Sequence, residues 1–250
     1  MDEKWKKLNK APVIVAIFQI KLEQIEKFSF NEFINNDKQI RKKFPKRHDN
    51  YHSSIGVQGT PHPGVSFVKA KADTQINSYS YTTDDQIHQL VIEQGSIRCI
   101  FEGSYESWHN FKNECLEDLS FLQEQLIKCS IIRTSIRFIN KFKFDTFDNP
   151  LDYFTTAISI DSDTKLNNPV IGFSYRFIQE VSGSSINTIV NHSLEKAEDK
   201  YDYYFDIDIL DHEVFGFNFD FIDQKLEQMR EIKNTIFFET LKEKTLEQCS

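Results

Sequence analysis

The stretch CSIIRTSIRFINKFKF, residues 129–144, has two faces that the sequence alone distinguishes. Successive side chains of a β-strand point to opposite faces, so alternate residues lie together. The even positions are nearly all apolar: Ile132, Thr134, Ile136, Phe138, Phe142 and Phe144. The odd positions are polar and mostly basic, with Arg133, Ser135, Arg137, Lys141 and Lys143. The pattern predicts a strand that turns one face to a core and the other to something polar.

The composition favours a sheet-rich protein with a sizeable core. The 250 residues include 23 Phe and 9 Tyr, and aromatic residues are enriched in strands. A chain of this length buries roughly three quarters of its unfolded surface, which allows one large domain or two small ones. The net charge of -8 argues against a surface that binds polyanions everywhere, because long-range repulsion opposes the encounter.

The sequence carries no sign of a membrane span or a metal. No segment approaches the run of about 18 apolar residues that a spanning helix needs, and residues 1–10 lack the apolar run of a signal peptide. The four cysteines are widely spaced, without a CxxC or a His/Cys metal pattern: Cys99, Cys115, Cys129 and Cys249. We therefore expect a cytoplasmic protein with reduced thiols, no metal and no cofactor.

The first half of the chain predicts a strand, a helix, several strands and a long helix. Val13–Leu22 is apolar on both faces at its start, which favours a central strand. Ser29 and Glu32 form a capping box for a helix that Pro45 ends. A long polar loop to Gly64 is expected next. Antiparallel strands at about 65–72, 77–81, 87–93 and 97–103 and an amphipathic helix capped by Ser107 complete the half.

The second half repeats this order. It starts with the strand of residues 129–144, whose Ile132, Ile136 and Phe138 are expected to pack under the helices. A short helix capped at Asn149-Pro150 follows, then strands at 170–181, 186–194 and 201–210 and a helix from Asp220 to about 241. The sequence predicts an α+β fold of two similar antiparallel units, residues 1–128 and 129–250, with helices on one face of each. The two units pack as one compact molecule, as an internal repeat or one continuous domain.

Three short motifs carry a resemblance to a known family. They are Leu8-Asn9-Lys10-Ala11-Pro12-Val13, Arg133-x-x-x-Arg137-Phe138-Ile139-Asn140 and Asn234-Thr235-Ile236-Phe237. Together they resemble a sporadically distributed prokaryotic family of about the length of this chain, without an established biochemical function. The chain departs from the pattern at Val15, where the family usually has an acidic residue, and near Arg230, where a His is usual. The resemblance implies no reaction, and the patchy distribution of the family fits mobile or defence-associated gene neighbourhoods.

The polar face of the second half is the first candidate site. If its strands share a sheet, one face gathers Arg133, Arg137, Asn140, Arg176, Asp206 and Asp208. Arginines supply planar donors for a carboxylate or phosphate, so such a surface would bind a small polar or anionic ligand, or a partner. The alternative is a wet sheet face with cross-strand ion pairs, each contributing well under about 1 kcal/mol.

Two further candidates lie between residues 38 and 62. A basic segment comprises Lys38, Arg41, Lys42, Lys43, Lys46 and Arg47, and it would give a salt-sensitive contact with nucleic acid unless it is simply a solvated helix face. His48, His52 and His62 would be zinc ligands only on a helix, whereas their Ser-Gly-Pro-rich context indicates a loop.

No motif for catalysis is present. The sequence has no G-x-S-x-G elbow, P-loop or G-x-G-x-x-G turn, and Asp206 with Asp208 is a pair that plain strand surfaces also show. We expect a non-enzymatic binding protein with a protein partner or a homo-oligomeric state, acting as an accessory component of a multi-gene bacterial system. The alternatives are a ligand- or nucleotide-binding domain or divergent enzyme that uses the Arg/Asp face, and a nucleic-acid-associated factor.

Overall fold

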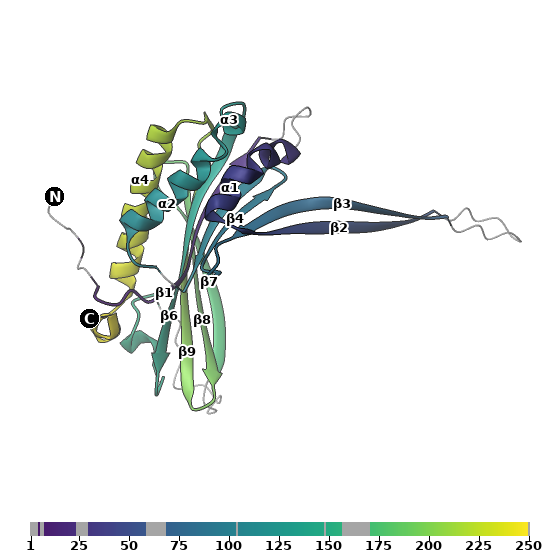
Figure 1. Ribbon diagram of the computed structural model, residues 1–250. Helices are drawn as coiled ribbons and strands as arrows, with labels where there is room; N and C mark the ends of the chain where they lie inside the picture. The colour runs from purple at the N-terminus through teal and green to yellow at the C-terminus, as the bar shows by residue number, and fades with distance from the viewer. Residues whose placement is uncertain are drawn as a thin grey trace, which may run out of the picture.

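The chain folds as an α+β protein, shown in Figure 1 as a computed structural model. The structure describes residues 5, 8–23, 30–58, 69–103, 105–147, 149–156 and 171–249. Within these residues one continuous antiparallel sheet runs in the order β2-β3-β4-β5-β1-β6-β9-β8-β7, and β10 pairs with β6 off this path. The strands are β1 Val13–Leu22, β2 Lys46–Gln58, β3 Lys69–Thr82, β4 His88–Glu93, β5 Ser96–Glu102, β6 Ser130–Phe144, β7 Gly172–Glu180, β8 Ile186–Ala197, β9 Lys200–Asp211 and β10 Phe215–Gly216.

The helices lie on one face of this sheet, with α2 and α4 side by side (Figure 1). Ser107 Oγ caps α2, as predicted, by accepting from Asn110 N at 3.2 Å. The helix predicted from Asp220 starts one residue earlier, because Asn218 Oδ1 accepts from Phe221 N at 3.0 Å. The helices are α1 Asp37–Lys43, α2 Trp108–Ser120, α3 Gln123–Leu126, α4 Phe219–Thr240 and α5 Glu243–Leu246, with 3-10 turns η1 Phe30–Asn36, η2 Pro150–Asp152 and η3 Glu247–Cys249.

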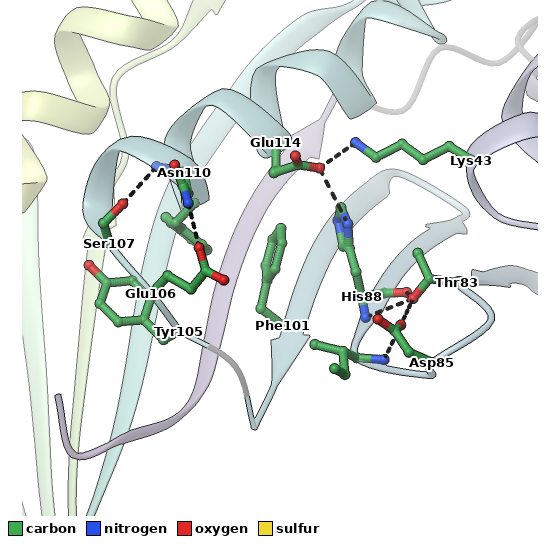
Figure 2. A pocket seen from close by; sticks show the side chains of 12 residues that line it. Lys43, Thr83, Asp85, His88, Phe101, Tyr105, Glu106, Ser107, Asn110 and Glu114 are labelled. Atoms are coloured by element: carbon green, nitrogen blue, oxygen red, sulfur yellow. Dashed lines mark hydrogen bonds and ion pairs between the residues drawn. The ribbon is translucent and has the colours of Figure 1, made fainter. Parts of the chain in front are cut away.

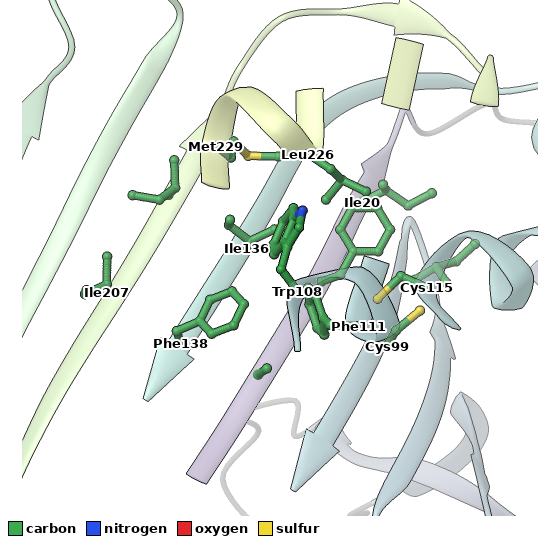
Figure 3. Close-up of a cluster of buried hydrophobic side chains, with 14 of the residues drawn as sticks. Ile20, Cys99, Trp108, Phe111, Cys115, Ile136, Phe138, Ile207, Leu226 and Met229 are labelled. Carbon is green, nitrogen blue, oxygen red and sulfur yellow. The ribbon is translucent and has the colours of Figure 1, made fainter. Parts of the chain in front are cut away.

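The core fills the space between the helices and the sheet (Figure 3). From Ala16 to Leu22, β1 supplies its even residues to the core, and its odd residues stay half-buried on the other face. β6 places Ile136 and Phe138 in the core as predicted, with 0% and 1% of their surface exposed. Each such buried side chain contributes about 1.5–3 kcal/mol to stability. Among the described helices, none is both long and apolar enough to cross a membrane.

The prediction for Ile132 is wrong. Ile132 is 37% exposed and Ile131 is fully buried instead. The pairing of β1 with β6 shifts between Lys21 and Leu22, so that Lys21 lies opposite Arg133 and Leu22 opposite Ile131. A bulge of one residue turns every side chain beyond it to the other face. The bulge therefore places Ile131 rather than Ile132 against the helices.

The polar loop expected after residue 48 is also wrong in its described part, because Lys46–Gln58 is strand β2. β2 pairs with β3 along its whole length, and the hairpin extends as an arm away from the body (Figure 1). Tyr51 is 62% exposed and His52 is exposed too. An arm in solvent needs no apolar face, so its sequence lacks the alternation by which strands are recognised. Ser29, residues 59–64 of the expected loop and residues 65–68 of the expected strand lie outside the described residues.

The two halves meet edge to edge in the middle of the sheet. β1 pairs with β5 on one side and with β6 on the other. From this seam the first half continues as β5-β4-β3 and the second as β9-β8-β7. Both halves consist of antiparallel strands, but these form one shared sheet within the described residues. The separate strands expected at 65–72 and 77–81 are wrong in their described part, because Lys69–Thr82 is the single strand β3.

Candidate functional site

The polar face of the sheet, on the side away from the helices, holds most of the predicted site residues. Arg137 donates two hydrogen bonds to Asp206, from Nε at 2.9 Å and from Nη2 at 2.7 Å. Asn191 Nδ2 donates to the same carboxylate at 2.9 Å. Asp206 is only 7% exposed, and its hydrogen bond raises the pKa of Arg137. The two parallel hydrogen bonds hold Arg137 and Asp206 in one fixed arrangement on this face.

Asp208 lies opposite Arg137 in register, yet it has no hydrogen bond within the described residues. Burial raises the pKa of its carboxyl to about 6, because desolvation outweighs the attraction of Arg137. Asp206 adds to this rise through its like charge. The two aspartates therefore differ: one is held by Arg137, and the other has free acceptor capacity.

Two arginines on this face have donors without acceptors. Arg133 donates from Nη2 to Gln19 Oε1 at 2.9 Å, but its Nε is buried without a partner in the described structure. Burial lowers the pKa of Arg133. Arg98 bonds Glu93 at 3.0 Å and likewise leaves Nε buried and unpaired. A buried donor without an acceptor costs about 1–3 kcal/mol.

The two remaining predicted residues of this site, Arg176 and Asn140, lie on opposite faces of the sheet. Arg176 is exposed on β7 and lies opposite Asn191, so it extends the polar face. Asn140 does not belong to it. Asn140 occupies an even position, shares the helix-covered side with Phe138, is 1% exposed and donates from Nδ2 to Phe205 O at 2.9 Å. Its amide satisfies a backbone carbonyl in the core, so we assign it a structural role.

The basic segment of residues 38–47 is largely neutralised by its own protein. Lys38 and Lys42 are exposed, but the other four cations have internal acceptors. Arg41 pairs with Asp37 at 2.7 Å, Lys43 with Asp118 at 2.8 Å, Arg47 with Asp49 at 2.6 Å, and Lys46 donates to Asp84 O at 2.8 Å. Cations already paired in this way have little left for phosphates, so the geometry does not favour nucleic-acid contact.

The histidines do not form the zinc pattern. His48 and His52 are exposed on β2, where they lie opposite Ser80 and Gln75, and His62 lies outside the described residues. Over the described part of the chain no group of three or more His, Cys, Asp or Glu side chains is placed to hold a metal.

The sequence did not predict the pocket that lies on the opposite, helix-covered side of the sheet (Figure 2). It has a volume of about 280 Å³, near the lower limit for small-molecule sites. The end of α1, the turn before β4, β5 and the start of α2 surround it, and we call it the α2 pocket. Its wall includes Lys43, His88, Phe101, Tyr105, Glu106 and Glu114.

A buried carboxylate organises one side of the α2 pocket. Asp118 is fully buried, with Oδ2 at 2.7 Å from His88 Nε2 and Oδ1 at 2.8 Å from Lys43 Nζ. Lys43 also contacts Glu114 and Glu117, each at 2.7 Å. Burial disfavours the charge of Lys43, but these carboxylates, Asp118 above all, raise its pKa beyond the ordinary value. Lys43 is therefore charged at neutral pH.

Neither the pocket nor its aspartate was predicted, although the sequence holds one signal for them. Asp118 falls on the inward stripe of α2 with Cys115 and Leu119, where a carboxylate needs a partner. Its partners come from α1 and β4, distant in sequence. Beside it, burial raises the pKa of the Cys99 and Cys115 thiols, so they are packing groups rather than nucleophiles.

One lysine stands apart from these ion pairs. Lys233 on α4 places Nζ at 4.6 Å from the centre of the Phe138 ring, and no carboxylate pairs with it in the described structure. Burial lowers its pKa to about 7, and the charge of Arg230 adds to the effect. By contrast, Lys225 on the same helix pairs with Asp211 at 2.8 Å.

Comparison with known proteins does not assign this chain to a family or a function. No family model matches the chain, and no curated protein matches it. The function of this protein is therefore argued from its own residues: a polar sheet face with unmet hydrogen bonds, and a small pocket beneath the helices.

Proposed function

We propose that this chain is a non-enzymatic binding protein and that the polar face of its sheet is the surface on which a protein partner docks. One observation carries the proposal. Arg133 and Arg98 each bury an Nε without an acceptor, and Asp208 is a half-buried carboxylate without a donor. A partner that supplies an acceptor for each of the two arginines and a donor for Asp208 would recover about 1–3 kcal/mol for each group that it satisfies.

The composition of the face favours a protein over a small anion. Donors and an acceptor lie together, so a uniformly charged ligand would meet repulsion as well as attraction. Half-buried apolar residues such as Ile17 and Ile139 surround the charges, and apolar area around a few directed polar contacts is typical of protein interfaces. The partner is either a different protein or a second copy of this chain.

We further propose that the two halves are copies of one unit. The support is the strand order, in which β1-β5-β4-β3 and β6-β9-β8-β7 run outward from the central seam, each half ending in a long helix. The family resemblance of the three motifs supports an accessory role in a multi-gene, defence-associated bacterial system. Identifying the genes adjacent to this one would test that role directly.

The test of the docking face is partner recovery with matched variants. Tagged wild-type protein would be used for co-purification from its native host, alongside Arg133→Ala, Asp208→Asn and the control Lys143→Ala. Lys143 is exposed on the same strand as Arg133. We expect the wild type and the control to recover the same protein, and the two face variants to recover at least tenfold less. Equal recovery by all four proteins would contradict the proposal. Light scattering of the purified chain distinguishes a self-partner.

A second function has one observation in its favour. The pKa of Asp208, raised to about 6, lies near the range in which carboxyl groups act as general acids or bases. A divergent enzyme that uses the Arg/Asp face is therefore the alternative. It predicts that a bound small molecule, detectable by native mass spectrometry, is lost in Asp208→Asn.

A further inference from the structure

The outer edge of β7 is a separate place for contact with a partner, and it does not rest on the proposed docking face. Among the described strands β7 is the last of the sheet and pairs with β8 alone, at the border of the sheet (Figure 1). It runs for nine residues, contains no proline and pairs with β8 without a bulge. A long, regular edge of this kind is a template for another strand.

The ladder with β8 shows which backbone groups of β7 face outward. Val181 N donates to Ile186 O at 2.9 Å, and Lys196 N donates to Ile171 O at 2.9 Å. Hydrogen-bonded positions alternate along an antiparallel pair, so the odd-numbered residues between these two contacts use their N–H and C=O groups on β8. The even-numbered residues of β7 therefore turn their backbone groups to the outer edge: Gly172, Ser174, Arg176, Ile178 and Glu180.

The side chains at this edge place an apolar group between two opposite charges. Ile178 is 65% exposed and lies opposite Ile189 of β8. Arg176 and Glu180 are exposed on either side of Ile178. They are four residues apart, about 13 Å along a strand, so they cannot pair with each other. Asp208 attracts Arg176 from β9, but within the described residues no ion pair holds Arg176 or Glu180.

A second copy of β7 complements this pattern. If the two strands run antiparallel with a two-fold axis at Ile178, each Arg176 lies opposite Glu180 of the partner subunit and Ile178 lies opposite itself. These positions are all even-numbered, so their outward N–H and C=O groups meet and exchange hydrogen bonds. Ile178 and Ile189 of both copies then form one apolar row across the joined sheets.

Other registers of the same two strands lack this match. An axis at Arg176 would place the two arginines opposite each other, where like charges are destabilising. An axis at Phe177 would place Arg176 opposite Ile178, without an ion pair. The side chains therefore favour the register centred on Ile178.

We propose that β7 pairs with β7 of a second copy of this chain, antiparallel and centred on Ile178, so that two sheets join into one across a symmetric dimer. The contacts between Arg176 and Glu180 set the register. The backbone hydrogen bonds between the copies close two edges that are open in the single chain.

Sedimentation of the purified chain over a range of concentrations tests this dimer. We expect a monomer–dimer equilibrium with a Kd of about 10 μM, as for a small interface. Arg176→Glu and Glu180→Arg each bring like charges together, and each should raise the Kd at least tenfold. An equimolar mixture of these two variants should dimerise like wild type, because positions 176 and 180 again carry opposite charges wherever they meet. Lys143→Glu, a charge reversal at an exposed residue of β6, is the control and should leave the Kd unchanged.

Ile178→Pro tests the backbone contribution. The N–H of Ile178 points outward, so proline removes an edge donor and leaves the ladder with β8 intact. We expect a folded monomer, with the fold checked by circular dichroism. If this variant does not fold, the mixture of the two charge variants decides alone.

The proposal is overturned if wild type stays monomeric at tenfold above the expected Kd, or if the single charge variants dimerise like wild type. It is also overturned if their mixture fails to dimerise, if Lys143→Glu raises the Kd as much as they do, or if folded Ile178→Pro still dimerises. A dimer lost in Arg133→Ala and kept in the β7 variants would assign self-association to the docking face instead.

Discussion

Replacing Lys233 by methionine is expected to stabilise the protein, with a gain that depends on pH. The lysine has an ordinary pKa of 10.5 that falls to about 7 in the folded state. Between these values the unfolded chain binds more protons than the folded one, so wild-type stability rises with pH across this window. Below pH 7 both states are protonated and the full penalty for the buried charge remains. Methionine keeps the contact with Phe138 and removes the charge.

The size of the gain follows from the same pKa values. Each pKa unit corresponds to about 1.4 kcal/mol, so the penalty is at most about 5 kcal/mol. Lys233 is half-buried rather than enclosed, and water screens part of its charge. We therefore expect about 2 kcal/mol of added stability at pH 6, shrinking toward zero near pH 10.

Urea unfolding at several pH values between 6 and 10 would measure this gain. Lys225→Met is the matched control on the same helix. Although burial opposes its charge, Lys225 has its pKa raised by Asp211 and Glu213, so its pairing is fully present below about pH 10 and is lost above that. The Lys225→Met control should destabilise the protein at neutral pH, because it removes the ion pair with Asp211. A Lys233→Met protein that is no more stable than wild type at pH 6, or whose gain does not change with pH, would refute the reasoning.

Three other substitutions test the remaining contacts by unfolding. Arg137→Ala leaves Asp206 buried beside Asn191 alone and should cost about 3 kcal/mol, whereas the same loss in Lys143→Ala would point to a general effect of the strand. Asp118→Ala leaves His88 Nε2 without an acceptor and should cost about 1–3 kcal/mol; an unchanged midpoint would contradict its role. Replacing residues 51–76 by an Asn-Gly turn removes the outer arm, and the melting temperature should stay within about 4 °C, since a larger fall would mean that the arm supports the body.

The sequence predicted those elements that have one buried face. β6 alternates because its even residues meet the helices and its odd residues do not, and this alternation survives in the sequence. It did not reveal the bulge at Ile132, which arises from how β1 pairs with β6. It also missed β2, because a strand in a solvent-exposed arm has no core to impose a pattern.

The candidate sites were likewise predictable where strand periodicity alone places the residues, and not where residues from distant elements meet. Arg137, Asp206 and Asp208 were grouped correctly on one face because strand periodicity places them there, and the further assumption that their strands share a sheet is confirmed. Asn140 lies on the helix-covered side, as its even position in the strand requires, and not on the face with Arg137. The α2 pocket needs Lys43, His88 and Glu114 from three separate elements, and no local pattern contains such a meeting.

The seam between β1 and β6 has a consequence for any attempt to divide the chain. A fragment that ends before β6 would leave the backbone groups of the ten-residue strand β1 bare along one side, and the complementary fragment would do the same with β6. Bare edges of this kind recruit other strands, so each fragment alone would self-associate or precipitate. Produced together, the fragments would rejoin along the same line. In this respect the pairing of β1 with β6 resembles an interface between two subunits, although both strands belong to one chain.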